Sequence, residues 1–222
     1  MQYLKNVTLL GASNVKTQDI KECLHLAPTL VAADGGAKIA VKMGQIPQKV
    51  IGDFDSIGKK TLGKIPPARL FKITDQNTTD FEKCLAHISA PMILGLGFMG
   101  RRLDHQLSAL NALVKFAHQP CVLLGKRDLV FHVPATLTLR LAPETRFSLF
   151  PLSQMRATST GLNWPIDEVH FSPNQSIGTS NLTNADQVTL TTDGPGLLAI
   201  LPRKTLTKVL DGFAAQSTVR EK

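Results

Sequence analysis

The chain has 222 residues, of which 43% are hydrophobic, and its formal net charge is +8. This length allows one large domain or two small ones, and the composition excludes an intrinsically disordered chain. The positive charge favours an anionic substrate or a nucleic acid as the partner. The basic residues are scattered, however, and no aromatic series is interleaved with them, so we expect no nucleic-acid partner.

Cys23, Cys84 and Cys121 are far apart, and the chain has no CxxC pair. This spacing fits neither a zinc site nor a disulfide framework, so we interpret the cysteines as small buried residues in a reducing compartment. The N-terminal segment "MQYLKNVTLLGAS" has too short an apolar run for a signal peptide or a membrane span. We therefore expect a cytoplasmic protein that has no membrane partner.

From the start of the chain to about residue 130, short apolar runs alternate with helix-like segments. The runs are "VTLLGA", "TLVAAD", "KVIGDF", "RLFKIT", "PMILGLG" and "CVLLG". Continuous apolar runs are typical of strands that are buried on both faces of a parallel sheet. The alternation with helices predicts βαβ units, and hence an N-terminal layered α/β domain with a mostly parallel sheet, at residues 1–135.

Two helices of this part can be predicted from their patterns. In "TTDFEKCLAHI", Thr79 and Glu82 have the spacing of a capping box. The apolar residues of this segment share one helix face: Phe81, Cys84, Leu85 and Ile88. In "LDHQLSALNALVKF", four apolar residues form one stripe that we expect in the core: Leu103, Leu107, Leu110 and Val114.

After about Leu139 the pattern changes to short alternating runs that are broken by Gly, Pro, Asn and Asp. The runs are "RFSLFPLS", "MRATSTGLNWPI", "SIGTSNLT", "QVTLTTDG" and "GLLAILP". Such runs predict antiparallel strands joined by turns, in a small sandwich or barrel, at residues 136–222.

Polar or glycine-rich stretches follow several strands of the predicted parallel sheet. They begin with Asp34, Gly35 and Gly36, continue with Asp53 and Asp55, and end in "DQNTTDFEK" and "GFMGRRLDH". In open parallel sheets, ligands bind beyond the carboxyl ends of the strands. We therefore expect these stretches to meet at one edge of the sheet.

Asp53 and Asp55 follow a predicted strand, where residues two apart point the same way. Two adjacent carboxylates repel each other unless a cation or a shared proton relieves the repulsion. With Asp80 they could hold Mg²⁺, which prefers a few carboxylates and phosphate oxygens. The alternative for Asp80 is an acid that the helix dipole favours in the first turn.

The remaining polar residues have a functional and a structural interpretation each. Gly35 and Gly36 could let the backbone approach a phosphate, or could form a tight turn. Lys83 could reach a phosphate or lie on the surface, and Arg102, near Asp104, could brace a phosphate with two hydrogen bonds. His105 could donate a hydrogen bond or be structural.

The glycines Gly95, Gly97 and Gly100 form a GxGxxG pattern late in the domain. The dinucleotide fingerprint belongs to the first βα unit and needs a downstream acid, so the pattern is weak support for a nicotinamide site. A GxxxxGK[ST] P-loop is absent from the sequence.

In chain order these stretches resemble the thiamine pyrophosphokinase family. The matching segments are "ADGGA" at 33–37, "IGDFDSI" at 51–57, "TDFEK" at 79–83, "GRRLDH" at 100–105, "GLNWPI" at 161–166 and "GTSN" at 178–181. The resemblance implies an α/β catalytic domain and an antiparallel β-sandwich domain that binds thiamine. It also implies a homodimer with shared active sites, and the reaction of ATP, as co-substrate, with thiamine to give AMP and thiamine diphosphate.

The resemblance assigns roles by position. Asp53, Asp55 and Asp80 would hold Mg²⁺. The nucleotide and transfer region would contain Asp34, Thr79, Lys83, Arg102 and Asp104, and we add Gly35, Gly36, Gly97 and His105 to it. Trp164, Ser180 and Asn181 would face thiamine.

The chain departs from the family pattern at three positions. Lys38, Arg101 and Leu182 stand where asparagine, glycine and an acidic residue are frequent. Two alternative functions stay open at this point: another magnesium-dependent small-molecule phosphotransferase, and a non-enzymatic protein that binds nucleotides or nucleic acid.

Overall fold

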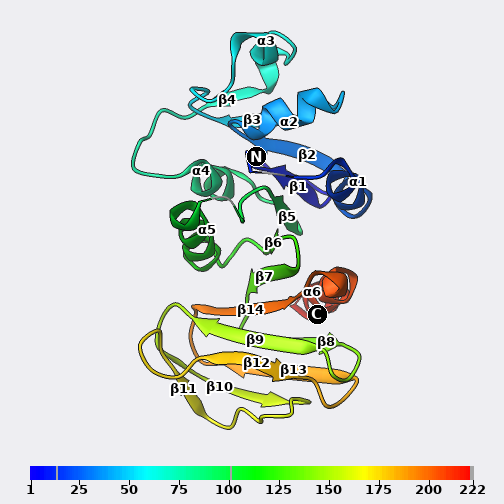
Figure 1. Ribbon diagram of the computed structural model, residues 1–222, viewed down its shortest axis with the longest axis vertical. Helices are drawn as coiled ribbons and strands as arrows, with labels where there is room; N and C mark the ends of the chain where they lie inside the picture. The colour runs from blue at the N-terminus through cyan, green and yellow to red at the C-terminus, as the bar shows by residue number, and fades with distance from the viewer. Residues whose placement is uncertain (14, 101, 221–222) are drawn as a thin grey trace. The chain divides into compact units, whose positions relative to one another are not determined.

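A computed structural model of the protein describes residues 1–13, 15–100 and 102–220, the segment 217–220 by its backbone alone. The chain divides into two compact units, Met1–Gly125 and Lys126–Lys222, which are drawn together in Figure 1 and are described here one at a time. Arg101, one of the departures from the family pattern, lies outside the described residues.

Unit 1 contains a parallel sheet whose strands are ordered β6-β5-β1-β2-β3-β4. The strands are β1 Val7–Leu10, β2 Thr29–Ala33, β3 Lys49–Gly52, β4 Leu70–Lys72, β5 Ile93–Leu96 and β6 Cys121–Leu124. All residues of β1, β2, β5 and β6 are buried, as expected for strands covered on both faces. The predicted strands and the layered α/β class are confirmed.

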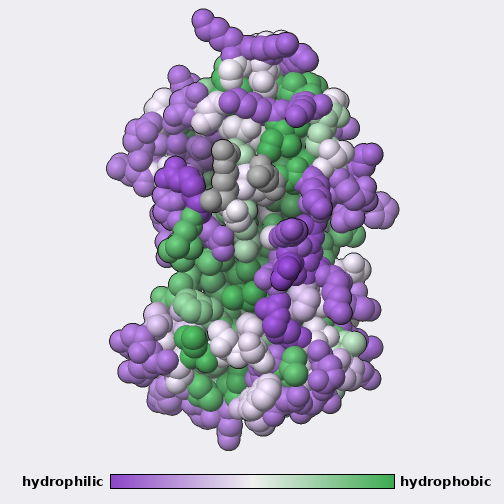
Figure 2. Space-filling model, in the orientation of Figure 1, coloured by the Kyte–Doolittle hydropathy of each residue, from purple (hydrophilic) through white to green (hydrophobic). Residues whose placement is uncertain are grey.

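The helices of unit 1 cover both faces of this sheet. They are α1 Thr17–Leu26, α2 Gly36–Lys42, α3 Lys59–Leu62, α4 Asp80–His87 and α5 Leu103–Lys115, with a 3₁₀ turn at Pro67–Arg69. In Figure 1, α4 and α5 lie side by side on one face, opposite α1 and α2. Figure 2 shows a hydrophilic surface over α3, where Lys59, Lys60 and Lys64 are exposed.

The start of α4 confirms the predicted capping box. The Thr79 hydroxyl accepts a hydrogen bond from the Glu82 backbone, and the Glu82 carboxylate accepts one from the Thr79 backbone. The predicted apolar face of this helix is buried: Phe81, Cys84, Leu85 and Ile88.

The predicted core stripe of α5 is wrong at its first two positions. The side chains of Leu103 and Leu107 are 71% and 57% exposed, whereas Ala109, Ala112 and Leu113 are buried. The covered face of α5 is therefore rotated away from the leucine stripe, because small alanines let the helix approach its neighbours closely. Spacing alone could not distinguish these two apolar faces.

Unit 2 contains two antiparallel sheets. One has the order β12-β9-β14-β7, with β7 Asp128–His132, β9 Arg146–Pro151, β12 Gly178–Leu182 and β14 Leu197–Pro202. The other has the order β11-β10-β13-β8, with β8 Thr136–Arg140, β10 Met155–Thr160, β11 Val169–Phe171 and β13 Gln187–Thr192. Alternate residues such as Phe147, Leu139 and Leu190 are buried, which confirms an antiparallel β-sandwich.

Two features of unit 2 were not predicted. Strand β7 lies within the range predicted for the α/β domain, and helix α6, Leu206–Arg220, follows a 3₁₀ turn at Arg203–Thr205. The helix is anchored by Val209, which is fully buried, and by Phe213, whose ring lies edge-on to Phe131 at 5.4 Å between centroids.

The three cysteines are buried and free, as expected. Within residues 1–13, 15–100 and 102–220, every helix is too short or too polar to cross a membrane.

Candidate active site

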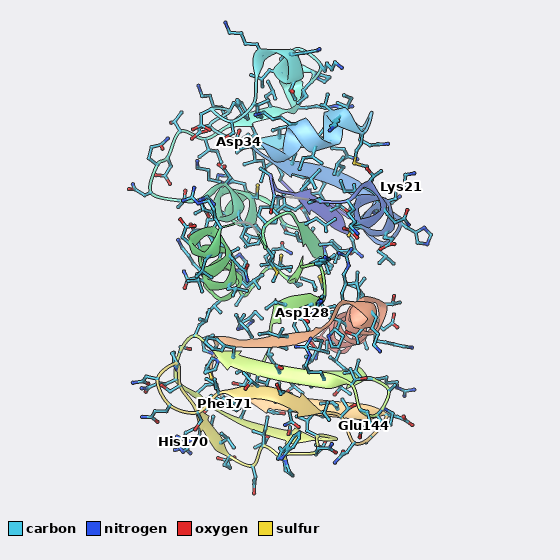
Figure 3. All side chains as sticks on the ribbon, in the orientation of Figure 1. Lys21, Asp34, Asp128, Glu144, His170 and Phe171 are labelled. Atoms are coloured by element: carbon cyan, nitrogen blue, oxygen red, sulfur yellow. The ribbon has the colours of Figure 1, made fainter. Side chains whose placement is uncertain are left out.

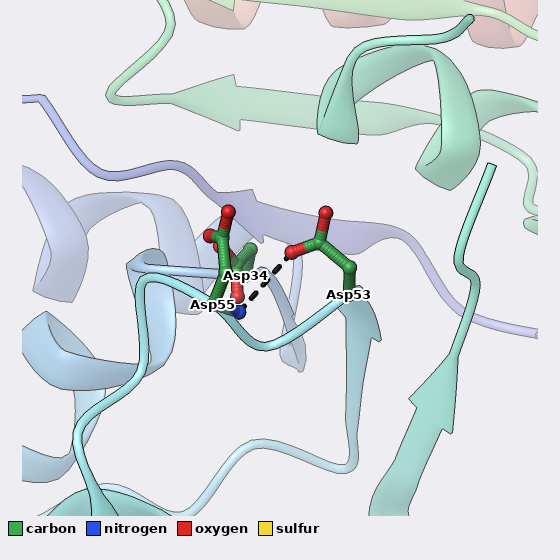
Figure 4. A group of neighbouring side chains, drawn as sticks. All are labelled: Asp34, Asp53 and Asp55. Carbon is green, nitrogen blue, oxygen red and sulfur yellow. Dashed lines mark hydrogen bonds between the residues drawn. The ribbon is translucent and has the colours of Figure 1, made fainter. Parts of the chain in front are cut away.

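Three carboxylates meet at the carboxyl ends of β2 and β3. Asp34 follows β2, while Asp53 and Asp55 follow β3, and the two strands are parallel neighbours with Ala33 opposite Ile51. One carboxylate oxygen from each of Asp34, Asp53 and Asp55 lies within 4.8 Å of the others, and Figure 4 shows the group. We call these residues the aspartate cluster.

A turn, rather than strand alternation, places Asp53 and Asp55 side by side. Strand β3 ends at Gly52, and Phe54 has a left-handed backbone with φ 71°. The Asp55 backbone N–H donates to Asp53 Oδ1 at 3.1 Å (Figure 4). The extended conformation does not persist beyond Gly52, and the turn brings the two predicted neighbours together instead.

Glycines make this edge compact. A Cβ on Gly52 would lie 2.7 Å from the Asp34 Cβ, and one on Gly36 would lie 1.9 Å from the Leu10 carbonyl oxygen. Real side chains cannot approach so closely, so Gly36 allows the start of α2 to contact the backbone of β1. This is a packing role for Gly36 as the first residue of α2, and the phosphate-binding role of the pair stays a prediction.

Asp34 is the most buried member of the aspartate cluster. Its side chain is 2% exposed, and its Oδ1 has no hydrogen-bond partner within the described part of the chain. The pKa of Asp34 is raised to about 6, chiefly by burial and also by the nearby Asp80 carboxylate, while the Ser56 hydroxyl opposes the shift. Asp34 lies beside the start of α2 in Figure 3.

Asp53 has the opposite electrostatic environment. The N–H of Asp55 lowers the pKa of Asp53, and Gln76, which donates to Asp53 Oδ2 at 3.3 Å, and Lys83 lower it further. The environment of Asp53 therefore favours its charged form, whereas that of Asp34 disfavours it.

Lys83 connects α4 to the aspartate cluster. Its side chain is 4% exposed, and its Nζ lies 3.3 Å from Asp80 Oδ1 and 3.8 Å from Asp53 Oδ2. The interpretation of Lys83 as a surface lysine is therefore wrong. Burial raises the pKa of Asp80 although the ion pair with Lys83 opposes the shift.

Arg102 and Asp104 pair with each other at the start of α5. Arg102 Nε donates to Asp104 Oδ1 at 3.1 Å, both side chains are 64% exposed, and the His105 backbone N–H also donates to Asp104. The pairing raises the pKa of Arg102 and lowers that of Asp104. Among the contacts of the described residues, none joins this pair to the aspartate cluster.

The β5–α5 loop is held against the neighbouring elements. A Cβ on Gly97, which has φ 82°, would lie 2.6 Å from the Gly11 carbonyl oxygen, so glycine is needed there. The Phe98 ring lies 4.5 Å from that of Phe81 on α4, measured between centroids. The loop thus follows the same sheet edge as the aspartate cluster.

In unit 2, the structure brings Trp164 and Asn181 together. The Trp164 backbone N–H donates to Asn181 Oδ1 at 3.1 Å, and Asn181 Nδ2 donates to the Trp164 carbonyl at 2.7 Å. The Trp164 side chain is 61% exposed, so it does not cover the sandwich core. The exposed Ser180 has φ 63°, and its backbone N–H donates to Ser148 Oγ at 3.0 Å.

Sequence reasoning missed two properties of this edge. It correctly predicted that the stretches of Asp34 and of Asp53 and Asp55 meet at one edge of the sheet, but it placed Asp34 in the nucleotide region and not in the candidate metal site. The available signal was that Asp34 directly follows a buried strand that neighbours β3. It also missed Gln76, whose contact with Asp53 spans 23 positions and has no local sequence pattern.

Comparisons with known proteins show which family the chain resembles. The family model "Thiamin pyrophosphokinase, catalytic domain" matches residues 20–124, and "Thiamin pyrophosphokinase, vitamin B1 binding domain" matches residues 135–197. Thiamine pyrophosphokinase 1 of Oryza sativa subsp. japonica is 30% identical over 197 residues, which cover 73% of this chain and 75% of that protein. Thiamin pyrophosphokinase 1 of Caenorhabditis elegans is 30% identical over 180 residues, covering 72% and 73%.

A solved structure shows the same fold. The thiamin pyrophosphokinase from Candida albicans superimposes with a TM-score of 0.76 at 16% identity, over 90% of this chain and 89% of that one. Both family models match in chain order and together span more than half of the chain. The chain therefore belongs to the thiamin pyrophosphokinase family and is an enzyme.

Proposed function

We propose that the enzyme transfers the pyrophosphoryl group of ATP to the hydroxyethyl oxygen of thiamine, and that the aspartate cluster is where the transfer takes place. The observation that carries this proposal is the meeting of Asp34, Asp53 and Asp55 at one carboxyl edge of the parallel sheet, within the range of the catalytic-domain match. This edge is where open α/β sheets bind their ligands.

The donor set of the aspartate cluster fits Mg²⁺. Carboxylate oxygens are the ligands that this ion prefers, and the buried Asp34 Oδ1 has no partner among the described residues. Asp53 and Asp55 keep the metal-binding role that the family resemblance implies, with Asp34 as the third carboxylate. Asp80, the third ligand implied by the resemblance, would join them when its ion pair with Lys83 opens. When bound, Mg²⁺ neutralises charge on the polyphosphate.

The side chains around the cluster would position the reactants. Lys83 would balance the charge of Asp80 and Asp53 before the polyphosphate binds, and then face a phosphate oxygen. Arg102, whose planar fork suits phosphate, would exchange Asp104 for the polyphosphate. The hydroxyethyl oxygen attacks the β-phosphorus in line, a carboxylate of this edge accepts its proton, and AMP leaves.

Unit 2 would supply the thiamine site. We propose a division of roles between residues 1–135, for ATP and Mg²⁺, and residues 136–222, for thiamine, with Trp164, Ser180 and Asn181 facing the vitamin. The exposed indole of Trp164 supports this role, since a cationic thiazolium favours an aromatic face. We further propose a homodimer with shared sites and, from the three free cysteines, a cytoplasmic location.

The test is chromatographic identification of the products from ATP, thiamine and Mg²⁺. We expect AMP and thiamine diphosphate in equal amounts, with AMP formation dependent on thiamine. Turnover of ATP without thiamine would indicate a different phosphotransferase. Salt-sensitive binding of polynucleotide without turnover would indicate a binding protein.

A further inference from the structure

Unit 2 contains a cavity of about 700 Å³ that none of the proposed roles uses. Its walls are strand β8, the start of β13 and helix α6. The helix lies beyond both ranges matched by the family models, so the cavity depends on a part of the chain outside those matches. Its volume lies in the range of roughly 300–1,000 Å³ that is typical of small-molecule sites.

The sheet wall of the cavity is polar. Leu137 and Leu139 of β8 point into the sandwich core, so Thr136, Thr138 and Arg140 point to the opposite face. Gln187 is the register partner of Arg140 on β13 and extends this face. A polar outer face is usual for a sandwich, and helix α6 lies along the edge of β8, the end strand of its sheet, where Gly212 approaches both the Thr138 carbonyl oxygen and the Leu139 side chain.

The helix wall combines Lys208, Asp211 and Gln216 with the small residues Gly212 and Ala215. The helix touches β8 at Gly212, where a Cβ would lie 2.9 Å from the Thr138 carbonyl oxygen. Near its described end, Gln216 Nε2 donates to the Thr136 carbonyl oxygen at 2.5 Å. Lys208 and Asp211 line the cavity between these contacts and the start of the helix. Because Val209 and Phe213 anchor the helix elsewhere, it stays beside β8 without filling the space.

Three charged side chains of the cavity are available to a ligand. Among the described residues, Arg140, Lys208 and Asp211 take part in none of the ion pairs that the structure shows. Two cations on opposite walls suit a phosphate group, and a carboxylate near one of them suits an amino group or a cation.

We propose that this cavity binds a small phosphorylated molecule that carries an amino-substituted heterocycle. The phosphate lies between Arg140 and Lys208, the amino group faces Asp211, and Thr136 and Thr138 offer hydroxyl groups to the rest of the ligand. AMP and thiamine diphosphate both have this chemistry, and a binding experiment can distinguish them. The proposal does not depend on the reaction at the aspartate cluster.

The test is a titration of the ¹⁵N-labelled full chain with AMP and, separately, with thiamine diphosphate, followed by the backbone amide resonances. We expect saturable shifts at Gly212, Ala215 and Thr138 with at least one of the two probes. Shifts with AMP alone, or with thiamine diphosphate alone, would assign the ligand class. The amides of Gly35 and Gly36 report separately on binding at the aspartate cluster.

Two variants make the test specific. The double substitution Arg140→Gln with Lys208→Gln should weaken binding at the cavity roughly tenfold or more, because it removes both phosphate contacts. The matched control, Arg156→Gln with Lys204→Gln, removes the same charge from exposed positions outside the cavity. Ala215→Leu, which fills the space without a change of charge, should abolish the shifts.

The absence of shifts at the cavity with both probes at millimolar concentration would overturn the proposal. An equal loss of affinity in the control pair would also overturn it, because the effect would then come from net charge. Circular dichroism of each variant verifies that the unit remains folded, so that a loss of binding reports on the cavity.

Discussion

At the scale of single residues, Asp34 has the most unusual environment of the candidate site. It has a positive φ of 36°, is 2% exposed, and its Oδ1, beside two other carboxylates, has no hydrogen-bond partner among the residues that the structure describes. Each of these properties destabilises the folded state, and such destabilising features are found mainly at functional sites. Asp34 is therefore the residue at which a conflict between stability and function should be measurable.

We expect Asp34→Asn to stabilise the metal-free protein above pH 6. The folded-state pKa of about 6 lies above the ordinary value of 3.8, so the folded state binds more protons than the unfolded state between these values. The free energy of unfolding of the wild type therefore falls as pH rises from about 4 to 6, by at most about 3 kcal/mol, and solvent screening reduces this figure. Asparagine tolerates the positive φ and cannot ionise.

Denaturant unfolding in EDTA at several pH values, for the wild type and Asp34→Asn, measures this difference. The gap between the two proteins should open between pH 4 and 6 and then remain constant. A gap that is the same at every pH would show that the Asp34 charge carries no penalty.

Asp53→Asn and Asp55→Asn should each lower kcat by roughly 10²-fold or more while the protein remains folded, because preorganised charge at the reacting phosphate is lost. Both variants should also need more Mg²⁺ for half-maximal activity. Asp75→Asn is the control, since the exposed Asp75 carboxylate lies outside the aspartate cluster and accepts hydrogen bonds from the Asn77 backbone and the Thr78 hydroxyl. Steady-state kinetics at varied Mg²⁺ concentration measures both effects. A wild-type Mg²⁺ dependence in both variants would refute the role of Asp53 and Asp55 in metal binding.

At the scale of elements, sequence patterns correctly predicted those strands and helix ends that depend on residues close together in the chain. Continuous apolar runs located the six strands of the unit 1 sheet, and the spacing of Thr79 and Glu82 located the start of α4. The predictions failed where contacts between distant segments determine the orientation of a helix or the conformation of a turn. The buried face of α5 depends on which neighbours reach it, and the approach of Asp53 to Asp55 depends on the left-handed conformation of Phe54.

Helix α5 allows a direct test of its corrected orientation. Leu113→Ala should lower the free energy of unfolding by about 2–5 kcal/mol, because a buried leucine leaves a cavity. Leu107→Ala, at a position that is 57% exposed, should change it by less than about 0.5 kcal/mol. Chemical denaturation of both variants measures the difference. Equal losses would restore the leucine stripe as the core face.

At the scale of the whole molecule, the sequence predicted two parts of different architecture, and the family models match one range in each. Helix α6 was missed because its apolar residues, Val209 and Phe213 among them, contact distant strands and form no clear stripe. The proposed homodimer with shared sites rests on the family resemblance alone, since a single chain carries no pattern that would reveal a partner.

Trp164→Ala should raise the KM for thiamine far more than the KM for ATP, because the single tryptophan is exposed and available to stack on the vitamin. Loss of a cation–π contact of roughly 0.5–2 kcal/mol corresponds to a few-fold to about thirtyfold effect. Steady-state kinetics with each substrate varied measures the two constants. Unchanged thiamine dependence would exclude the stacking role.

Shared sites predict complementation between protomers. Mixing Trp164→Ala with Asp55→Asn should restore some activity where each variant alone is poorly active, because a mixed dimer holds one site without either substitution. Native mass spectrometry of the mixture verifies subunit exchange. Verified exchange without any recovery would mean that each site belongs to a single protomer.

The central claim is transfer of an intact pyrophosphoryl group, and the position of an isotopic label tests it most directly. The enzyme would be incubated with thiamine, Mg²⁺ and ATP that carries ³²P at the β-phosphorus, and the products separated by chromatography. We predict that the label appears in thiamine diphosphate, with an equal amount of unlabelled AMP. Label retained in ADP, accompanied by thiamine monophosphate, would contradict the claim.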